Sequence, residues 1–476
     1  MKKLTAVLLS LALVLSLCGF GLAFADEAPE EDGFVYEDVF ADWNEGAPAL
    51  NALIEYVEAV TDEASPDFIP VEDRLAVFDM DGTLYGELFP TYLEYYTLAW
   101  RILEDPSIVP DSEMLALGRE LRESVISGSF ASDMPLRHAI QAARAYSGLT
   151  LQEFAAYING CLVREVDGFE GMTYATAFYT PMLEVIEYLQ DNEFKVFVCS
   201  GSDRFICRVL LEGMIDIPYE NIIGMDVGFE ATGQGDVDGL DYVFKAGDDV
   251  VRTEQLIIKN LKMNKVLQIV QDIGRKPVLS FGNSSGDVSM HMYTVSDNPY
   301  RSAAFMLIAN DDERDYGNVE KAERLGEQWE AAGFHVISMR DDFRTIYGDN
   351  VVKTGSFRWA DEMAEERIPM EGESGRYTFH DLSSAALLVE ESLSSWGCEL
   401  HALRYAGDEA NNEENLSWLK NLGEGAEYVE CLEFVTDFHS PAEGEGAWNY
   451  DTEYTDYQWW LARTEGGSWE LLSWGY

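Results

Sequence analysis

Short apolar runs alternate with helical patterns between residues 41 and 348 of the chain. Short runs of this kind, bounded by turn residues, are typical of buried strands. They lie at residues 75–78, 194–198, 278–281, 303–309 and 335–339. Helical patterns flank them, among them residues 43–60 and residues 318–332, the latter closed by Gly333. Strands alternating with helices predict an α/β fold with a parallel sheet covered on both faces.

The interval between the first two predicted strands is too long for a loop in a compact domain. Apolar residues recur at helical spacing within it, at residues 92–103, 112–127 and 137–147. We therefore predict a helical cap, about residues 87–180, inserted into an α/β domain of residues 41–350.

The composition changes after residue 350. Residues 351–375 are rich in Gly, Glu and Ser, which is typical of a linker. A helix-like run at residues 380–395 is followed by strand-like runs at 399–405, 428–437, 457–463 and 468–474. The pattern predicts a separate C-terminal α+β domain over residues 376–476.

The N-terminus has the pattern of a signal peptide. Lys2 and Lys3 precede an apolar run at residues 4–17, and residues 23–25 have the A-x-A form of a cleavage site. We predict a signal peptide at residues 1–25, cleavage after Ala25, a secreted protein, and an acidic leader at residues 26–40. Lipid anchoring at Cys18 is the alternative, but Leu17 stands where a lipobox needs a small residue. No other apolar run approaches the length of a membrane span.

The charge of the chain excludes one class of partner. Its 476 residues include 32 Lys and Arg against 87 Asp and Glu, a formal net charge of -55. Nucleic acids bind clustered basic side chains, so a nucleic-acid partner is not expected. A hydrophobic content of 47% also excludes a disordered acidic chain, because it supplies enough apolar side chains for a core.

The cysteines do not form a recognisable disulfide framework. Five remain after removal of the signal peptide, an odd number in a long chain. Cys398 and Cys431 are the pair that could join within the C-terminal domain.

The first predicted strand ends in two carboxylates, Asp79 and Asp81, followed by Gly82. Residues two apart alternate faces in a strand, but a turn at the glycine lets both carboxylates address one site. One carboxylate can capture a phosphoryl group, and the other can protonate the leaving alkoxide and then deprotonate water. A simple Asp-Gly turn is the structural alternative.

The second strand ends in Ser200 and Gly201, where a hydroxyl can donate to a phosphoryl oxygen. A helical pattern at residues 255–272 carries Lys265, which can balance the charge of the nucleophile and the phosphoryl group. Lys262, one turn away in this pattern, is the alternative.

The third strand ends in a loop of residues 282–287 that contains Asn283 and Asp287. Their oxygens are ligands of the kind that Mg²⁺ prefers. Together with Asp79 and the backbone carbonyl of Asp81, they could hold one ion that neutralises the transferring group. The acidic residues 311–313 do not complete a calcium-binding loop, and we interpret them as a solvated turn.

These residues resemble motifs one to four of the haloacid dehalogenase-like (HAD) superfamily, in its phosphoserine-phosphatase-like branch with a C1-type helical cap. The motifs are residues 79–83, Ser200, Lys265 and residues 282–287, and the likeness covers about residues 41–348. It implies a Rossmann-like core and an Mg²⁺-dependent phosphomonoesterase that forms an aspartyl-phosphate, and the predicted signal peptide makes this enzyme a secreted one. It also implies the following roles: Asp79 as nucleophile, Asp81 as acid and base, Ser200, Gly201 and Lys265 on the substrate, and Asp79, Asp81, Asn283 and Asp287 around Mg²⁺.

Two positions depart from the family's pattern. Asn283 stands where an aspartate is usual, which removes one charge from the metal site. Glu87 resembles the acidic residue that binds the substrate ammonium in phosphoserine phosphatases, at a slightly different spacing. We therefore expect a small phosphorylated metabolite as substrate, with phosphoserine as one candidate. The alternatives are a phosphotransferase and a weak or inactive HAD-like module in a secreted binding protein.

The C-terminal region resembles the small cystatin-like and NTF2-like domains appended to secreted proteins. Its aromatic residues, such as Trp459 and Trp474, would either bind a ligand, whose identity the sequence does not give, or form the core.

The net charge would repel an anionic phosphate ester at long range. We expect a basic stretch in the segment before motif four to offset this repulsion at the site. It comprises Lys245, Lys259, Lys262, Lys265, Arg275 and Lys276.

Overall fold

A computed structural model describes residues 39–87, 91–235, 237–355, 367–423, 425–443 and 449–476. The predicted signal peptide, residues 26–38 of the acidic leader and residues 356–366 of the linker lie outside the described residues. The residue limits predicted for the domains stay predictions. No helix within the described ranges has the length and apolar character that crossing a membrane requires.

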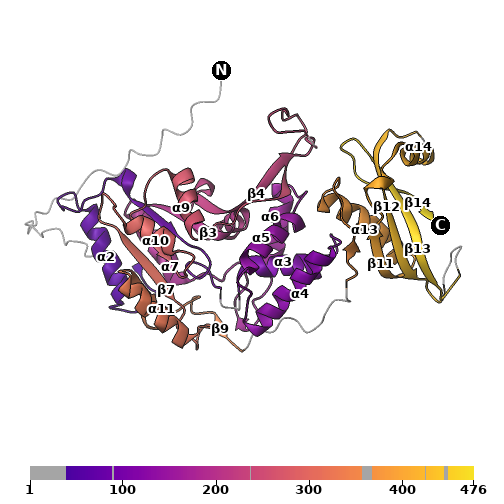
Figure 1. Cartoon of the computed structure of the whole chain (residues 1–476). Coiled ribbons are helices and arrows are strands. Elements are labelled where there is room, and N and C mark those ends of the chain that lie inside the picture. The colour runs from indigo at the N-terminus through magenta and orange to yellow at the C-terminus, as the bar shows by residue number, and fades with distance from the viewer. Residues whose placement is uncertain (1–38, 88–90, 236, 356–366, 424, 444–448) are drawn as a thin grey trace, which may run out of the picture. The chain divides into compact units, whose positions relative to one another are not determined.

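The central sheet has seven strands in the order β5-β4-β3-β1-β6-β7-β8 (Figure 1). All neighbouring pairs are parallel except β4 and β5. The predicted α/β fold with a parallel, Rossmann-like sheet is therefore confirmed. The strands are β1 (Leu75–Phe78), β3 (Lys195–Asp203), β4 (Ile222–Ala231), β5 (Val250–Ile258), β6 (Leu279–Gly282), β7 (Ala303–Ile308) and β8 (His335–Ser338).

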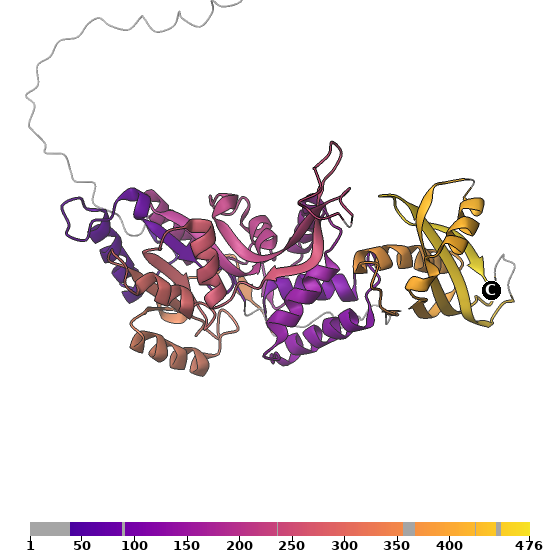
Figure 2. The ribbon, with the colours of Figure 1, turned by 45° about the horizontal axis from the view of Figure 1, so that its top comes forward.

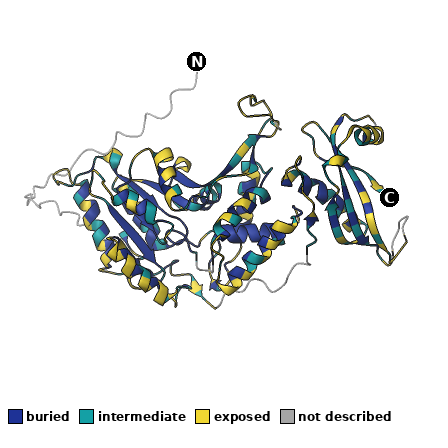
Figure 3. Ribbon diagram, in the orientation of Figure 1, coloured by how far each residue is buried: buried dark blue, intermediate teal, exposed yellow. Residues whose placement is uncertain are grey.

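The middle of this sheet is buried because its strands are almost entirely apolar. Every residue of β1, β6 and β7 is buried (Figure 3). Phe78, Phe281 and Phe305 are register partners on these strands, and their rings stack at centroid distances of 4.2 and 4.9 Å. The helices outside the insertion are α2 (Pro48–Thr61), α7 (Thr180–Asp191), α8 (Arg204–Leu211), α9 (Met263–Gln268), α10 (Val288–Val295), α11 (Val319–Ala331) and α12 (Met339–Asp342).

Among the described residues, four helices lie between β1 and α7 in the chain, and we call these helices, α3–α6, the helical insertion. They are α3 (Leu93–Leu103), α4 (Ser112–Ser127), α5 (Met134–Ala145) and α6 (Leu151–Leu162). Figures 1 and 2 both show them side by side, next to β4. Ala139 and Ala143 of α5 pack against Met225 and Val227 of β4. The insertion is therefore packed onto a strand of the central sheet.

One predicted helix is wrong in its first part. Residues 255–258 belong to β5, which pairs antiparallel with β4, and the helix begins only at Met263. The β-branched residues at 250, 251, 253, 257 and 258 suit a strand that has a pairing partner, and this overrides the helical spacing. A short strand pair that the sequence did not indicate joins β2 (Phe169–Glu170) to β9 (Val352–Lys353).

The C-terminal region forms a second sheet in the order β10-β11-β12-β13-β14, which confirms the predicted additional α+β domain. Its elements are β10 (Met370–Glu371), α13 (Phe379–Ser395), β11 (Glu399–Tyr405), α14 (Glu413–Leu422), β12 (Tyr428–His439), β13 (Glu453–Thr464) and β14 (Glu470–Gly475). Trp459 is fully buried, stacked on Trp396, so it belongs to the core of this domain. Cys398 and Cys431 are free thiols, so the disulfide considered for them is not formed.

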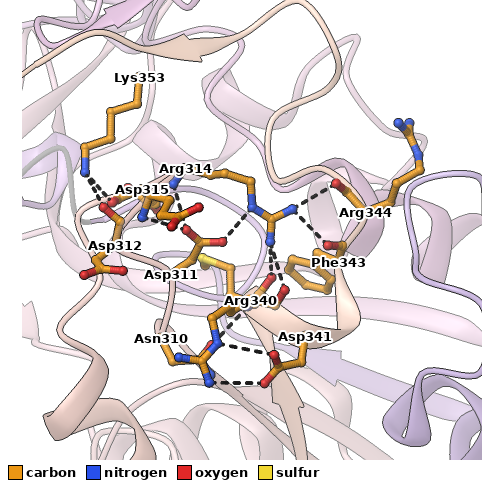
Figure 4. Close-up of polar contacts among 12 residues, drawn as sticks. Asn310, Asp311, Asp312, Arg314, Asp315, Arg340, Asp341, Phe343, Arg344 and Lys353 are labelled. Atoms are coloured by element: carbon orange, nitrogen blue, oxygen red, sulfur yellow. Dashed lines mark hydrogen bonds and ion pairs between the residues drawn. The ribbon is translucent and has the colours of Figure 1, made fainter.

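The acidic turn after β7 is solvated only at Asp312 and Glu313, which are exposed, whereas Asp311 belongs to an arginine-centred junction (Figure 4). Asp311 is 2% exposed, and its carboxylate accepts from the Arg314 Nε at 2.6 Å. Arg314 also donates to the backbone carbonyls of residues 339, 340, 343 and 344 at 2.9–3.2 Å. The guanidinium satisfies these carbonyls at once because its donors are fixed in a planar fork. The prediction failed because the partners of Arg314 come from a distant segment.

We expect Arg314→Lys to lower the free energy of unfolding by about 2–4 kcal/mol, because one ammonium cannot replace the donors to Asp311 and four carbonyls. Urea denaturation followed by circular dichroism measures the change. The control is Arg275→Lys, whose side chain is 53% exposed and should change stability by less than about 0.5 kcal/mol. Equal effects of the two variants would contradict the role given to Arg314.

Candidate active site

The carboxyl ends of three adjacent strands, β3, β1 and β6, meet at one edge of the central sheet. Asp79 and Asp81 follow β1, Ser200 and Ser202 lie near the end of β3, and the 282–287 loop follows β6. In parallel sheets this edge is where sites gather, because all strands deliver their following loops to it. The structure thus brings together the three strand ends that the sequence singled out.

The turn after β1 places both aspartates at this edge. Gly82 has a φ of +78°, which a residue with a side chain rarely adopts. A Cβ on Gly82 would lie 1.8 Å from the Asn283 Nδ2 atom and 2.7 Å from the Glu87 carboxyl carbon. The glycine therefore serves both the turn and the close approach of two polar side chains.

Lys265 reaches the nucleophile position predicted for Asp79. Its Nζ donates to the Asp79 Oδ1 at 2.5 Å and to the Asp287 Oδ1 at 2.6 Å. The side chain is 1% exposed, and the two carboxylates outweigh burial, so they hold the pKa of Lys265 above its usual value. Lys262, the alternative, is exposed and precedes α9 with a φ of +56°. The structure places Lys265 at the site and Lys262 outside it.

Asp81 is held by two hydroxyls from β3. Its Oδ2 accepts from Ser202 Oγ at 2.7 Å and from Ser200 Oγ at 3.4 Å. The two serines share a face because side chains alternate along a strand. Ser200 is fully buried, while Gly201 and Ser202 line the cavity described below. The sequence reasoning missed Ser202, although its spacing from Ser200 could have indicated it.

Asp287 organises the loop after β6. Its Oδ2 accepts from the backbone N–H of Asn283 at 3.2 Å and of Ser284 at 3.0 Å. Its other oxygen is bonded to Lys265, so both oxygens already have protein donors. The Asn283 side chain instead donates from Nδ2 to the Glu87 Oε1 at 2.9 Å.

The carboxyl groups of the site are crowded and buried. Burial first, and the charge of Asp287 second, raise the pKa of Asp79 to about 7. Burial raises the pKa of Asp81 to about 6 against the opposing hydrogen bond from Ser202. Burial, Asp81 and Asp79 together raise the pKa of Glu87 to about 8. For Asp287 the attraction of Lys265 outweighs burial and holds its pKa below the usual value. Asp79, Asp81 and Glu87 are therefore protonated more readily than exposed carboxyl groups, whereas Asp287 keeps its charge.

The donor set fits a hard divalent cation. The Asp81 Oδ1 atom is buried and has no hydrogen-bond partner among the described residues. Within the same residues, no three His, Cys, Asp or Glu side chains form a metal-binding group, and the Lys265 Nζ lies between Asp79 and Asp287. A cation would therefore use mixed oxygens: Asp79, the Asp81 backbone carbonyl and the Asn283 amide. Both carboxylate oxygens of Asp287, which was predicted as a ligand, accept from protein donors instead.

A cavity of about 70 Å³ opens beside these groups. The helical insertion contributes Tyr92, Glu94, Tyr95 and Pro135 to its wall. Glu94 accepts from the Lys259 Nζ at 2.6 Å, an ion pair between the insertion and the segment after β5. The sequence gave no signal for this pair, whose members are 165 residues apart.

Only two residues of the predicted basic stretch, Lys259 and Lys265, line the cavity. Arg275 donates to Asp73 and to the backbone carbonyl of Glu72, and Lys276 donates to the Ser296 carbonyl. The expectation that all six basic residues gather at the site is therefore wrong, because most of them find partners elsewhere on the surface.

Comparison with known proteins yields only distant similarities. No protein-family model and no curated protein matches the chain. A functionally unknown protein from Anaerococcus prevotii DSM 20548 is 12% identical, with 65% of this chain and 98% of that one covered and a TM-score of 0.39. Cytosolic 5'-nucleotidase IIIB bound to cytidine is 10% identical, with 61% and 84% covered and a TM-score of 0.37.

A phosphoserine phosphohydrolase-like protein from Francisella tularensis subsp. tularensis SCHU S4 is 12% identical, with 56% and 94% covered and a TM-score of 0.31. The matching structures thus include a 5'-nucleotidase, a phosphoserine phosphohydrolase-like protein and a dehalogenase. At TM-scores below 0.5 these structures carry no functional argument for this chain.

We expect Lys265→Met to lower the free energy of unfolding by about 3–5 kcal/mol, because it leaves two buried carboxylates without their counter-charge. Chemical denaturation at neutral pH in the presence of a chelator measures the loss. The matched control is Lys262→Met, three residues earlier and exposed, which should have little effect. A stable Lys265→Met protein would show that the ion pairs do not hold the site together.

Proposed function

We propose that this protein is a secreted, Mg²⁺-dependent phosphomonoesterase that acts through an aspartyl-phosphate on a small phosphorylated metabolite. The observation that carries the proposal is the separate support of two neighbouring carboxylates at one cavity. Asp79 is bound by Lys265, whereas Asp81 is bound by Ser202. Two acids held in different environments can take different roles, one as nucleophile and one as proton carrier.

In the first step, the Asp79 oxygen that is not bonded to Lys265 attacks phosphorus. An Asp79–phosphorus bond forms, the bond from phosphorus to the leaving oxygen breaks, and Asp81 gives its proton to that oxygen. Lys265 stays beside Asp79 and stabilises negative charge on the phosphoryl oxygens. Gly201 and Ser202 of β3 line the cavity, where they would contact the same oxygens.

In the second step, water attacks the phosphorus of the aspartyl-phosphate. Asp81 takes the proton of the water, the bond to Asp79 breaks, and inorganic phosphate leaves. Both aspartates return to their starting states, so the cycle is balanced. Ser202 keeps Asp81 in place throughout, because its hydroxyl is bonded to one carboxylate oxygen and leaves the other free.

Mg²⁺, when bound, would supply positive charge beside the transferring phosphoryl group. Asp79, the Asp81 backbone carbonyl and Asn283 are the residues that would hold it, with Asp287 fixing the loop that carries Asn283.

The cavity favours a small leaving group. Its wall combines the aromatic rings of Tyr92 and Tyr95 with the charged pair of Glu94 and Lys259. A zwitterionic alcohol such as serine could contact both members of this pair, which supports a phosphoserine-like substrate. The absence of a second carboxylate at position 283 supports the competing proposal of a weak or inactive module in a binding protein. That proposal predicts no turnover and saturable ligand binding by the C-terminal domain.

We expect the purified protein to hydrolyse p-nitrophenyl phosphate with Mg²⁺. Asp79→Asn should reduce activity to background, because the amide cannot form the covalent intermediate. Asp81→Asn should lower kcat by about 10²–10⁴-fold, because it cannot donate or accept the proton. Release of inorganic phosphate from a panel including phosphoserine and phosphorylcholine identifies the leaving group.

A wild-type protein without turnover, or full activity of Asp79→Asn, would contradict the proposed chemistry. Phosphate transferred to an added alcohol in excess of free phosphate would favour a phosphotransferase.

A further inference from the structure

We propose that Glu87 is a positioning residue for the cation and that Glu87 compensates for the asparagine at position 283. The inference rests on the proposed Mg²⁺-dependent function and assigns Glu87 to the metal side of the cavity, not to the substrate. Glu87 holds the Asn283 amide by its NH₂ group, which leaves the amide oxygen for the cation, and it supplies the negative charge that an aspartate at 283 would bring.

The contact between Glu87 and Asn283 is built into the turn after β1. The Glu87 Oε1 accepts from the Asn283 Nδ2 at 2.9 Å. Both side chains occupy the space that any side chain on Gly82 would need, since a Cβ there would lie 2.7 Å from the Glu87 carboxyl and 1.8 Å from the Asn283 amide. Gly82 lies next to Asp81, so the pair sits directly against the proposed catalytic carboxylates.

Glu87 has no protein cation of its own. No Lys or Arg among the described residues forms an ion pair with it, and its electrostatic neighbours are Asp81, Asp79 and Asp287. Lys265 is already bonded to Asp79 and Asp287. Glu87 is half-buried and surrounded by acids, so a divalent cation at this edge would favour its charged form.

The hydrogen bond from Asn283 to Glu87 also orients the Asn283 amide. A side-chain amide carries one oxygen that can bind a metal and one NH₂ group that cannot. An acceptor on the NH₂ group fixes which end faces the ion, as partners of metal ligands commonly do. Glu87 has the acceptor and the charge, whereas a glutamine would have the acceptor alone.

The experiment measures Mg²⁺ binding without substrate, from the rise of the thermal unfolding midpoint of the full-length mature protein during a Mg²⁺ titration. Glu87→Gln keeps the acceptor for Asn283 and removes the charge. It should weaken Mg²⁺ binding by about tenfold or more. The double variant Glu87→Gln with Asn283→Asp transfers the carboxylate from position 87 to position 283. The hydrogen bond between the two positions can still form, with the glutamine as donor and the aspartate as acceptor. Its Mg²⁺ affinity should return to within about threefold of wild type.

Asn283→Asp alone gives an independent check. It places two carboxylates at the position of a 2.9 Å hydrogen bond, so the metal-free protein should unfold at a lower temperature than wild type. Mg²⁺ should then raise its unfolding midpoint more than it raises that of wild type. Circular dichroism of each variant before titration shows that it is folded.

Unchanged Mg²⁺ affinity in Glu87→Gln, or no recovery in the double variant, would overturn this inference and leave the proposed function standing. If Glu87 instead binds a substrate ammonium, Glu87→Gln would raise the KM for phosphoserine while Mg²⁺ affinity stays constant, which also overturns it. A wild-type protein that Mg²⁺ does not stabilise would overturn both this inference and the Mg²⁺ dependence of the proposed function.

Discussion

A lysine ammonium buried between two carboxylates needs support from every segment that carries one of the three groups. Lys265 comes from α9, Asp79 follows β1, and Asp287 precedes α10. Strands β1 and β6 are adjacent in the sheet, and the rings of their register partners Phe78 and Phe281 stack. If either strand shifted by one residue, its side chains would exchange faces and the ion pairs would be lost. The site and the centre of the sheet therefore depend on the same register.

Much of the site could be predicted because it obeys local rules. Asp79, Asp81 and the 282–287 loop follow short apolar strands, and parallel strands deliver their ends to one edge. Whether Lys262 or Lys265 reaches the site depends on where the helix begins. The helical spacing at residues 255–258 hides this start, because those residues belong to β5 and the helix begins at Met263. The pairing of β5 with β4 decided it, and pairing is a long-range property.

The wall of the cavity could not be predicted for a similar reason. Glu94 and Lys259 are ordinary charged residues in their own segments, and only the packing of the helical insertion against β4 brings them together. Residues 311–313 have the pattern of a solvated turn, yet the adjacent Arg314 binds carbonyls of a segment about one helix and one strand further along the chain. Local patterns identified strands and turns, whereas partners distant in sequence determined what their charged residues do.

The packing of α5 on β4 restricts how a ligand can enter. Arg252, almost fully buried, pairs with Asp203 at 2.5 Å and lies 4.0 Å from the ring centre of Phe154 in α6. A lid that swung away from the sheet would expose this charge and the alanines of α5 to water, at a cost of several kcal/mol. Exchange of small molecules is therefore cheaper by local movement of side chains at the cavity mouth than by hinged opening. A substrate of the proposed reaction would therefore have to reach Asp79 while the helical insertion stays packed on β4.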